Sequence, residues 1–191
     1  MAPLVEVGTV CDRQRLLSER LLTGESVCDE EANILGCELY EAAAAGKVGD
    51  MQKPFAAGAS LEVGDSDCET PLFMAGSEGR VEAVRWLLKV GAQADRRNYY
   101  EQTPLHKAAE RGHASVIDLL VAACASADVT DNGGDTPLRL SAEHGHLEAT
   151  RALLQAGADR GVKNEEQRTP LDVAIKHNRQ EVVDILMNYS P

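Results

Sequence analysis

The chain has 191 residues, of which 43% are hydrophobic but only 4% aromatic, and its formal net charge is −12. An acidic chain repels phosphate backbones and anionic membrane surfaces, so we expect no nucleic acid and no membrane as its partner. A protein with a basic patch fits better, above all against residues 1–69, which carry 14 acidic and 5 basic residues.

The first 32 residues form an N-terminal extension whose role the sequence leaves open. Met1 to Val10 lack a basic start and a long apolar run, so we expect no secretory signal. Residues 11–22 are compatible with three turns of helix, with Leu17 and Leu21 on one face. Three alternatives stay open for this segment: it caps the following repeats, it is disordered, or it binds a partner.

A tripeptide Thr-Pro-Leu then recurs at a spacing of 33 residues, beginning at Thr70, Thr103, Thr136 and Thr169. Nine residues after each threonine comes a glycine or asparagine, namely Gly79, Gly112, Gly145 and Asn178. Threonine caps helix N-termini, proline suits the first helical position, and glycine or asparagine supplies the left-handed turn that ends a helix. Each copy therefore predicts a short helix followed by a second one, and a period of about 33 indicates stacked helix pairs.

The segment Thr103-Pro104-Leu105-His106-Lys107-Ala108-Ala109, followed by Gly112-His113, resembles the ankyrin repeat. A fifth, degenerate copy around Leu39–Ala43 lacks Thr-Pro and has Cys37 at the threonine position, as expected of a terminal repeat. The resemblance implies an all-α ankyrin-repeat solenoid of stacked helix pairs with β-turn fingers. We expect the repeat domain to span residues 33–191, with repeats at about 33–65, 66–98, 99–131, 132–164 and 165–191.

Two departures from the pattern predict local strain. Pro54 aligns with Leu87 inside a second helix, which it should shorten or kink, because an interior proline costs about 3 kcal/mol. Cys124 stands where other copies have the glycine of Gly-Ala. If the left-handed turn is kept there, cysteine costs on the order of 1 kcal/mol relative to glycine.

Nothing in the sequence favours catalysis or a bound cofactor. The five cysteines are odd in number and contain no Cys-x-x-Cys, which argues against disulfides and zinc and predicts reduced thiols in the cytoplasm or nucleus. The resemblance implies structural roles for His106, His113 and His146. His144 should diverge from His146, so we expect no metal site. No phosphate loop, nucleophile elbow or paired-carboxylate motif is present, so we do not expect an enzyme.

The resemblance implies that partners dock on the fingers and on the concave face of the first helices. We number the fingers by repeat: finger 2 is residues 65–69, finger 3 is 98–102, finger 4 is 131–135 and finger 5 is 164–168. The predicted partner-binding residues are Ser66, Asp67, Glu69, Glu78, Tyr99, Tyr100, Gln102, Glu110, Arg111, Asn132, Asp135, Glu143, His144, Glu165, Glu166, Arg168, Lys176 and His177.

Tyr99 and Tyr100 stand out among these residues because finger tips are normally polar. Tyrosine is enriched at binding hot spots, which favours a contact with a partner. The alternative is that one tyrosine packs back onto a neighbouring finger. Trp86, by contrast, aligns with Leu119 and Ile185 and is expected in the core or half-buried.

The sequence thus predicts a monomeric, non-enzymatic interaction module that binds a protein partner as an adaptor, inhibitor or assembly factor. A self-associating structural subunit is the alternative.

Overall fold

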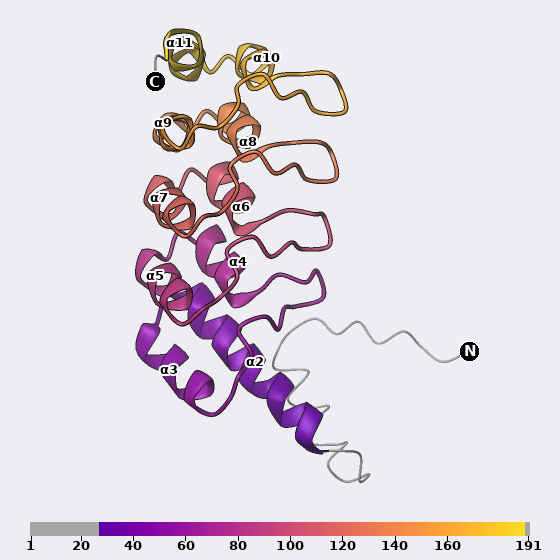
Figure 1. The fold of residues 1–191 in the computed structure, drawn as a ribbon, viewed down its shortest axis with the longest axis vertical. Helices are drawn as coiled ribbons and strands as arrows, with labels where there is room; N and C mark the ends of the chain where they lie inside the picture. The colour runs from indigo at the N-terminus through magenta and orange to yellow at the C-terminus, as the bar shows by residue number, and fades with distance from the viewer. Residues whose placement is uncertain (1–26, 190–191) are drawn as a thin grey trace, which may run out of the picture.

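The computed structural model describes the backbone of residues 27–189 and the side chains of residues 34–189. Ten helices lie in this part of the chain, in five pairs that stack in one direction (Figure 1). The first helices of the pairs are α2 (Val27–Ala45), α4 (Pro71–Ser77), α6 (Pro104–Glu110), α8 (Pro137–His144) and α10 (Pro170–Lys176). The second helices are α3 (Val48–Ala56), α5 (Val81–Lys89), α7 (Ala114–Ala122), α9 (Leu147–Gln155) and α11 (Gln180–Asn188). Each pair packs against the next along the chain, so the predicted all-α solenoid is confirmed.

The first helices begin and end where the repeated residues predict. Thr70, Thr136 and Thr169 each accept a hydrogen bond at Oγ1 from the backbone N–H three residues on, at 3.2 Å. A proline follows each capping threonine at the first helical position. The residues that end these helices have positive φ, from 56° at Asn178 to 79° at Gly145. The tripeptide and the glycine therefore set the length of each first helix.

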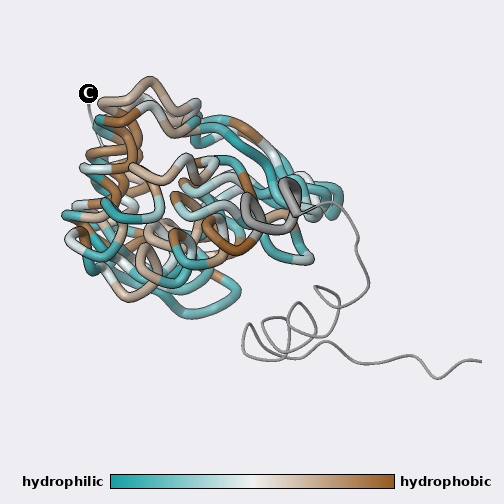
Figure 2. The backbone as a smooth tube through the Cα atoms, turned by 90° about the horizontal axis from the view of Figure 1, so that it is seen from below, coloured by the Kyte–Doolittle hydropathy of each residue, from teal (hydrophilic) through white to brown (hydrophobic). Residues whose placement is uncertain are grey.

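The core is a series of thin aliphatic layers, as the low aromatic content requires. Leu72, Leu105 and Leu138, three of the four leucines of the tripeptide, are fully buried, and the fourth, Leu171, is partly buried. Leu87, Leu120 and Leu153 of the second helices are fully buried in the same cluster. Burying each leucine contributes about 1.5–3 kcal/mol. Because each layer touches only its neighbours, stability is distributed along the stack. Hydrophobic segments lie mainly in the helices, and hydrophilic ones prevail along the fingers (Figure 2).

Side chains at a spacing of 33 residues reach back to join each repeat to the one before it. Each hydrogen bond runs to a backbone carbonyl at 2.9–3.1 Å: Arg80 Nε to that of Ala44, His113 Nε2 to that of Ser77, His146 Nε2 to that of Glu110 and Arg179 Nε to that of Glu143. The side chains cross the glycines that end the first helices, where no Cβ would fit. A Cβ on Gly79 would lie 2.6 Å from the His113 ring, and one on Gly112 equally close to the His146 ring. These glycines are therefore required for contact as well as for positive φ.

The first pair differs from the others because its first helix has no Thr-Pro start. Helix α2 begins at Val27 and runs through the stretch that corresponds to a finger in later repeats (Figure 1). Gly36 lets it approach closely, since a Cβ there would lie 2.8 Å from a Val63 methyl group. The Tyr40 hydroxyl donates to Asp65 Oδ2 at 2.8 Å and ties α2 to finger 2. The predicted helix at residues 11–22 lies outside the described residues, and the repeat boundaries stay a prediction.

The two departures from the pattern have different outcomes. Helix α3 has nine residues with Pro54 inside it, the same length as α5, so the predicted shortening is wrong. Pro54 is buried near the C-terminal end of α3, where the loss of one helical hydrogen bond leaves most of the helix intact. Cys124 keeps the left-handed turn with φ 64°, so the condition for its predicted cost is met.

Candidate functional site

Each finger is a turn built on its first side chain. Oδ1 of Asp65, Asn98, Asp131 and Asn164 accepts hydrogen bonds from the backbone N–H groups two and four residues later, at 2.9–3.1 Å. Aspartate and asparagine favour such turns because their short side chains reach their own backbone. The first side chain of each finger therefore fixes the shape of its turn.

Neighbouring fingers are joined through their backbones into one continuous row (Figure 1). Three hydrogen bonds at a spacing of 33 residues make the connection: Tyr99 N–H to the Asp67 carbonyl at 2.8 Å, Asn132 to Tyr100 at 3.1 Å and Glu165 to Gly133 at 3.1 Å. Side chains add to them, since the Asn98 amide donates to Glu69 and the Gln102 amide to Asp131. The finger tips are thus held at fixed separations.

Tyr99 and Tyr100 both project from the tip of finger 3. They are 72% and 51% exposed, and their rings meet edge to face with centroids 5.6 Å apart. Neither ring is buried, and whether the tyrosines contact a partner stays a prediction. Ile175 and Met187 are the other large exposed hydrophobic residues of the described chain, and they lie in α10 and α11. Trp86 is half-buried against Phe55, as predicted.

The concave helix face consists of exposed and half-exposed residues on the first helices and just after them: Glu78, Glu110, Arg111, Glu143, His144, Lys176 and His177. Its carboxylates are already paired with cations. Arg111 lies 2.6 Å from Glu78 across two repeats, and Lys107 lies 2.8 Å from Glu110. Arg139 lies 3.1 Å from Glu143. Pairing of this kind orients the side chains and leaves little net charge on this face.

All 18 predicted partner-binding residues are at least partly accessible, and none is buried. They form two strips, the row of finger tips and the concave helix face. Ser77, the last residue of α4 and the neighbour of Glu78, is buried, and its carbonyl accepts the hydrogen bonds of His113 and Arg111. Whether the accessible residues contact a partner stays a prediction.

Arg139 is a site residue that sequence reasoning missed. Its side chain is only 9% exposed and pairs with Asp135 on one side and Glu143 on the other. It thereby holds a finger residue and a helix residue in fixed positions. The spacing of four residues between Arg139 and Glu143 was a usable signal, because such pairs face one another on a helix, whereas Asp135 lies just before α8.

The left-handed residues of the fingers were also missed. Cys68, Glu101 and Gln167 have φ of 63°, 59° and 60°, and Gly134 has φ 74° at the corresponding position of finger 4. Only the glycine signals this geometry in the sequence. Three of the four fingers therefore keep a strained residue next to their tips.

The histidines serve mainly to hold neighbouring turns and repeats together through hydrogen bonds. Nδ1 of His106 accepts from the Thr103 N–H at 3.1 Å, and Nε2 lies 3.0 Å from the Asp135 carbonyl, which requires a neutral ring with its proton on Nε2. Burial lowers the pKa of His106 and of His146. The predicted structural roles of His106, His113 and His146 are confirmed.

The predicted divergence of His144 from His146 is wrong. Their rings lie parallel with centroids 6.1 Å apart. Each ring, however, uses one nitrogen on a carbonyl, His144 on Leu140 and His146 on Glu110. Among the described residues, no group of three or more histidine, cysteine or acidic side chains is placed to hold a metal ion.

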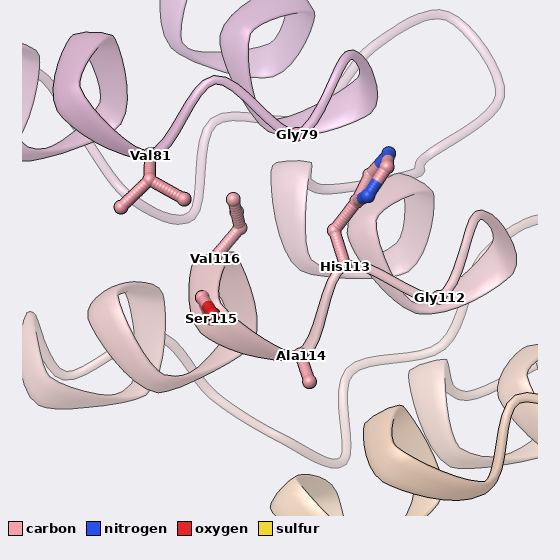
Figure 3. Close-up of a pocket in the computed structure, with 7 residues that line it drawn as sticks. All are labelled: Gly79, Val81, Gly112, His113, Ala114, Ser115 and Val116. Carbon is pink, nitrogen blue, oxygen red and sulfur yellow. The ribbon is translucent and has the colours of Figure 1, made fainter.

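A shallow groove of about 330 Å³ lies where α4 and α5 meet α6 and α7, away from the fingers (Figure 3). Gly79, Val81, His113, Ser115 and Val116 line it. The groove lies at the contact between two repeats. Nε2 of His113 is already hydrogen-bonded to the Ser77 carbonyl, so the groove adds no reactive group to the candidate site.

The fold and the surface together define a solenoid that presents a row of rigid turns and one helix face. A family model described as ankyrin repeats (3 copies) matches residues 39–132 and 119–191, and the chain belongs to this family. Ankyrin repeats are generally protein–protein interaction modules and are usually non-catalytic. A comparison with curated proteins gives no match. Within residues 27–189, no helix is long and apolar enough to cross a membrane.

Proposed function

We propose that the chain is a non-enzymatic module, acting as an adaptor, inhibitor or assembly factor, that binds a protein partner with its finger tips and concave helix face. The observation that carries this proposal is the exposure of Tyr99 and Tyr100 at a finger tip. Tyrosine offers a large contact area, a polar end and few rotatable bonds, which is why it dominates many interfaces. Two such rings exposed together on one turn form an aromatic patch that a partner can cover.

The rigidity of the surface supports the same function. Backbone hydrogen bonds join the fingers, and ion pairs hold Glu78, Arg111, Glu110 and Glu143 on the concave helix face. A surface that is already ordered loses less conformational entropy on binding, so more of the contact energy appears as affinity. This mechanism needs presentation of side chains and no chemical step.

The test is the double substitution Tyr99→Ala/Tyr100→Ala. Partners are first captured from native extract with the wild-type chain and identified, and affinity is then measured with the purified partner. Loss of both rings should cost 2 kcal/mol or more, which is about thirtyfold in Kd. The unfolding midpoint should hardly change, because the rings lie outside the core. Glu148→Gln on the outer face of α9 is the control and should leave Kd unchanged.

If the double variant unfolds easily but binds normally per folded molecule, the tyrosines are structural and the binding surface lies elsewhere. Arg111→Ala and His144→Ala should weaken the same complex by less than the tyrosine pair. Both residues are exposed on the concave helix face, at the C-terminal ends of α6 and α8.

We favour a protein with a basic patch as the partner. We expect the chain to bind neither a nucleic acid nor a membrane. The net charge of −12 supports this choice, and affinity should then fall as salt rises, because exposed charges are screened over about 8–10 Å. Cys37, Cys68 and Cys124 are free thiols, which supports a place in the cytoplasm or nucleus.

Self-association is the second candidate, and exposed Ile175 and Met187 are the observation that favours it. We propose a monomer, with a mass by light scattering that does not change with concentration. A mass that rises with concentration and returns to the monomer value in Ile175→Glu/Met187→Glu would instead support the second candidate.

A further inference from the structure

Fingers 2 and 3 lie side by side and combine two kinds of side chain. The hydrogen bond between Tyr99 N–H and the Asp67 carbonyl, at 2.8 Å, fixes the tips next to each other. Finger 3 contributes two exposed rings at an interplanar angle of 89°. Finger 2 contributes three carboxylates within five residues, those of Asp65, Asp67 and Glu69. Aromatic faces and carboxylates therefore adjoin on one accessible surface.

The carboxylates of finger 2 form no ion pair with a cation in the described part of the chain. Asp65 accepts from backbone N–H groups and the Tyr40 hydroxyl, and Glu69 accepts from the Asn98 amide. Burial raises the pKa of Glu69, and the charges of Asp65 and Asp67 add to this effect, whereas the Asn98 hydrogen bond and the charge of Lys107 oppose it. Just before finger 3, Arg97 is paired with Glu101 at 2.7 Å.

This contrasts with the concave helix face, where carboxylates are paired with Arg111, Lys107 and Arg139. Among the acidic residues of the predicted binding surface, Asp67, Glu69 and Glu165 form no ion pair within residues 34–189, and two of these three lie on finger 2 next to the tyrosines. A partner that meets the whole surface gains most from a cation placed at this point, where a ring face and a carboxylate act on the same group.

We propose that the surface formed by Tyr99, Tyr100 and Asp67 takes an arginine side chain from a basic segment of the partner protein. This inference rests on the proposed function and names the chemistry of its partner. A guanidinium is planar, stacks on an aromatic ring and still donates from its edge to a carboxylate. A lysine ammonium is a compact, strongly hydrated point charge that cannot do both as well. Acidic segments and nucleic acid are repelled from the same place.

The probe is a fluorescein-labelled octa-arginine peptide, titrated with the full chain at low salt and followed by fluorescence anisotropy. Octa-lysine of the same length is the comparison. We expect octa-arginine to bind more tightly than octa-lysine. Tyr99→Ala/Tyr100→Ala should weaken octa-arginine binding by about fivefold or more, as expected for loss of cation–π contacts. Tyr99→Phe/Tyr100→Phe keeps the rings and should retain most of the affinity.

Charge-matched variants distinguish binding at a specific site from general electrostatic attraction between a basic peptide and an acidic protein. Asp67→Asn should weaken octa-arginine binding by about threefold, whereas Glu148→Gln should change it little. Glu148 is an exposed carboxylate on α9, outside the proposed binding surface, so its loss changes the net charge equally. Equal effects of Asp67→Asn and Glu148→Gln, or equal binding by the tyrosine and alanine forms, overturn the inference.

The proposed function fails separately from this inference. If the alanine double variant loses the native partner while octa-arginine binding is insensitive to it, the module binds by the tyrosines but not through an arginine. If octa-arginine binding depends on the tyrosines while the native partner binds the variant normally, the arginine site exists but the proposed binding surface is wrong.

Discussion

Cys124→Gly should stabilise the protein, which is unusual for the loss of a side chain. Cys124 has φ 64°, and the left-handed conformation costs a residue with a Cβ about 1–2 kcal/mol. About 0.4–1 kcal/mol of this gain is lost, because glycine makes the unfolded chain more flexible and so raises the entropy cost of folding. Cys124 is exposed, and an added Cβ at the corresponding Gly91 or Gly157 meets nothing within 4 Å, so no packing is lost. The net gain is about 0.5–1 kcal/mol.

Chemical denaturation of wild type, Cys124→Gly and Cys124→Ala measures this gain. The alanine variant removes the thiol but keeps the Cβ, so it should remain close to wild type. The glycine variant should unfold at higher denaturant, with a melting temperature about 1–4 °C higher. Equal stability of the glycine and alanine variants would refute the reasoning, since it would mean that the left-handed turn costs nothing at this position.

Three further predictions concern the repeat pattern. Thr136→Ala should lower the free energy of unfolding by about 1 kcal/mol, because Oγ1 no longer caps α8; an unchanged denaturation midpoint would contradict the cap. Gly112→Ala should lower the free energy of unfolding by more than Cys124→Gly raises it, because the Cβ of the alanine would lie 2.6 Å from the His146 ring. Stability should fall as pH drops below about 6.5, because burial lowers the pKa of His106 and the unfolded chain then binds more protons. Urea titrations at pH 7 and pH 5 should show a smaller loss in His106→Gln.

The regular part of the fold was predictable because local chemistry repeats in it. Thr136, Pro137 and Gly145 set the start and end of α8 without help from distant residues. The first pair was harder, since α2 continues through the finger position where no capping residue interrupts it. The shortening predicted for Pro54 is wrong because the cost of a proline depends on where it falls within the helix and on what packs around it.

The candidate site was predictable in outline but not in its electrostatics. The turn chemistry of Asn98 fixed where finger 3 lies, and its tip residues followed. Which carboxylates are neutralised depends on contacts between repeats, such as Arg111 with Glu78, and these were not readable along the sequence. The parallel rings of His144 and His146 likewise result from three-dimensional packing.

The side chains that join the repeats bond to backbone carbonyls, and this makes the length of the protein adjustable. Every repeat offers such a carbonyl whatever its sequence, so removal of residues 99–131 would bring His146 to the Ser77 carbonyl that His113 now uses. Asn132 N–H would likewise meet the Asp67 carbonyl in place of Tyr99. We expect a shorter solenoid that folds but lacks the tyrosine pair. In this architecture a unit can be lost or duplicated as a block, and the surface changes while the joints between units stay the same.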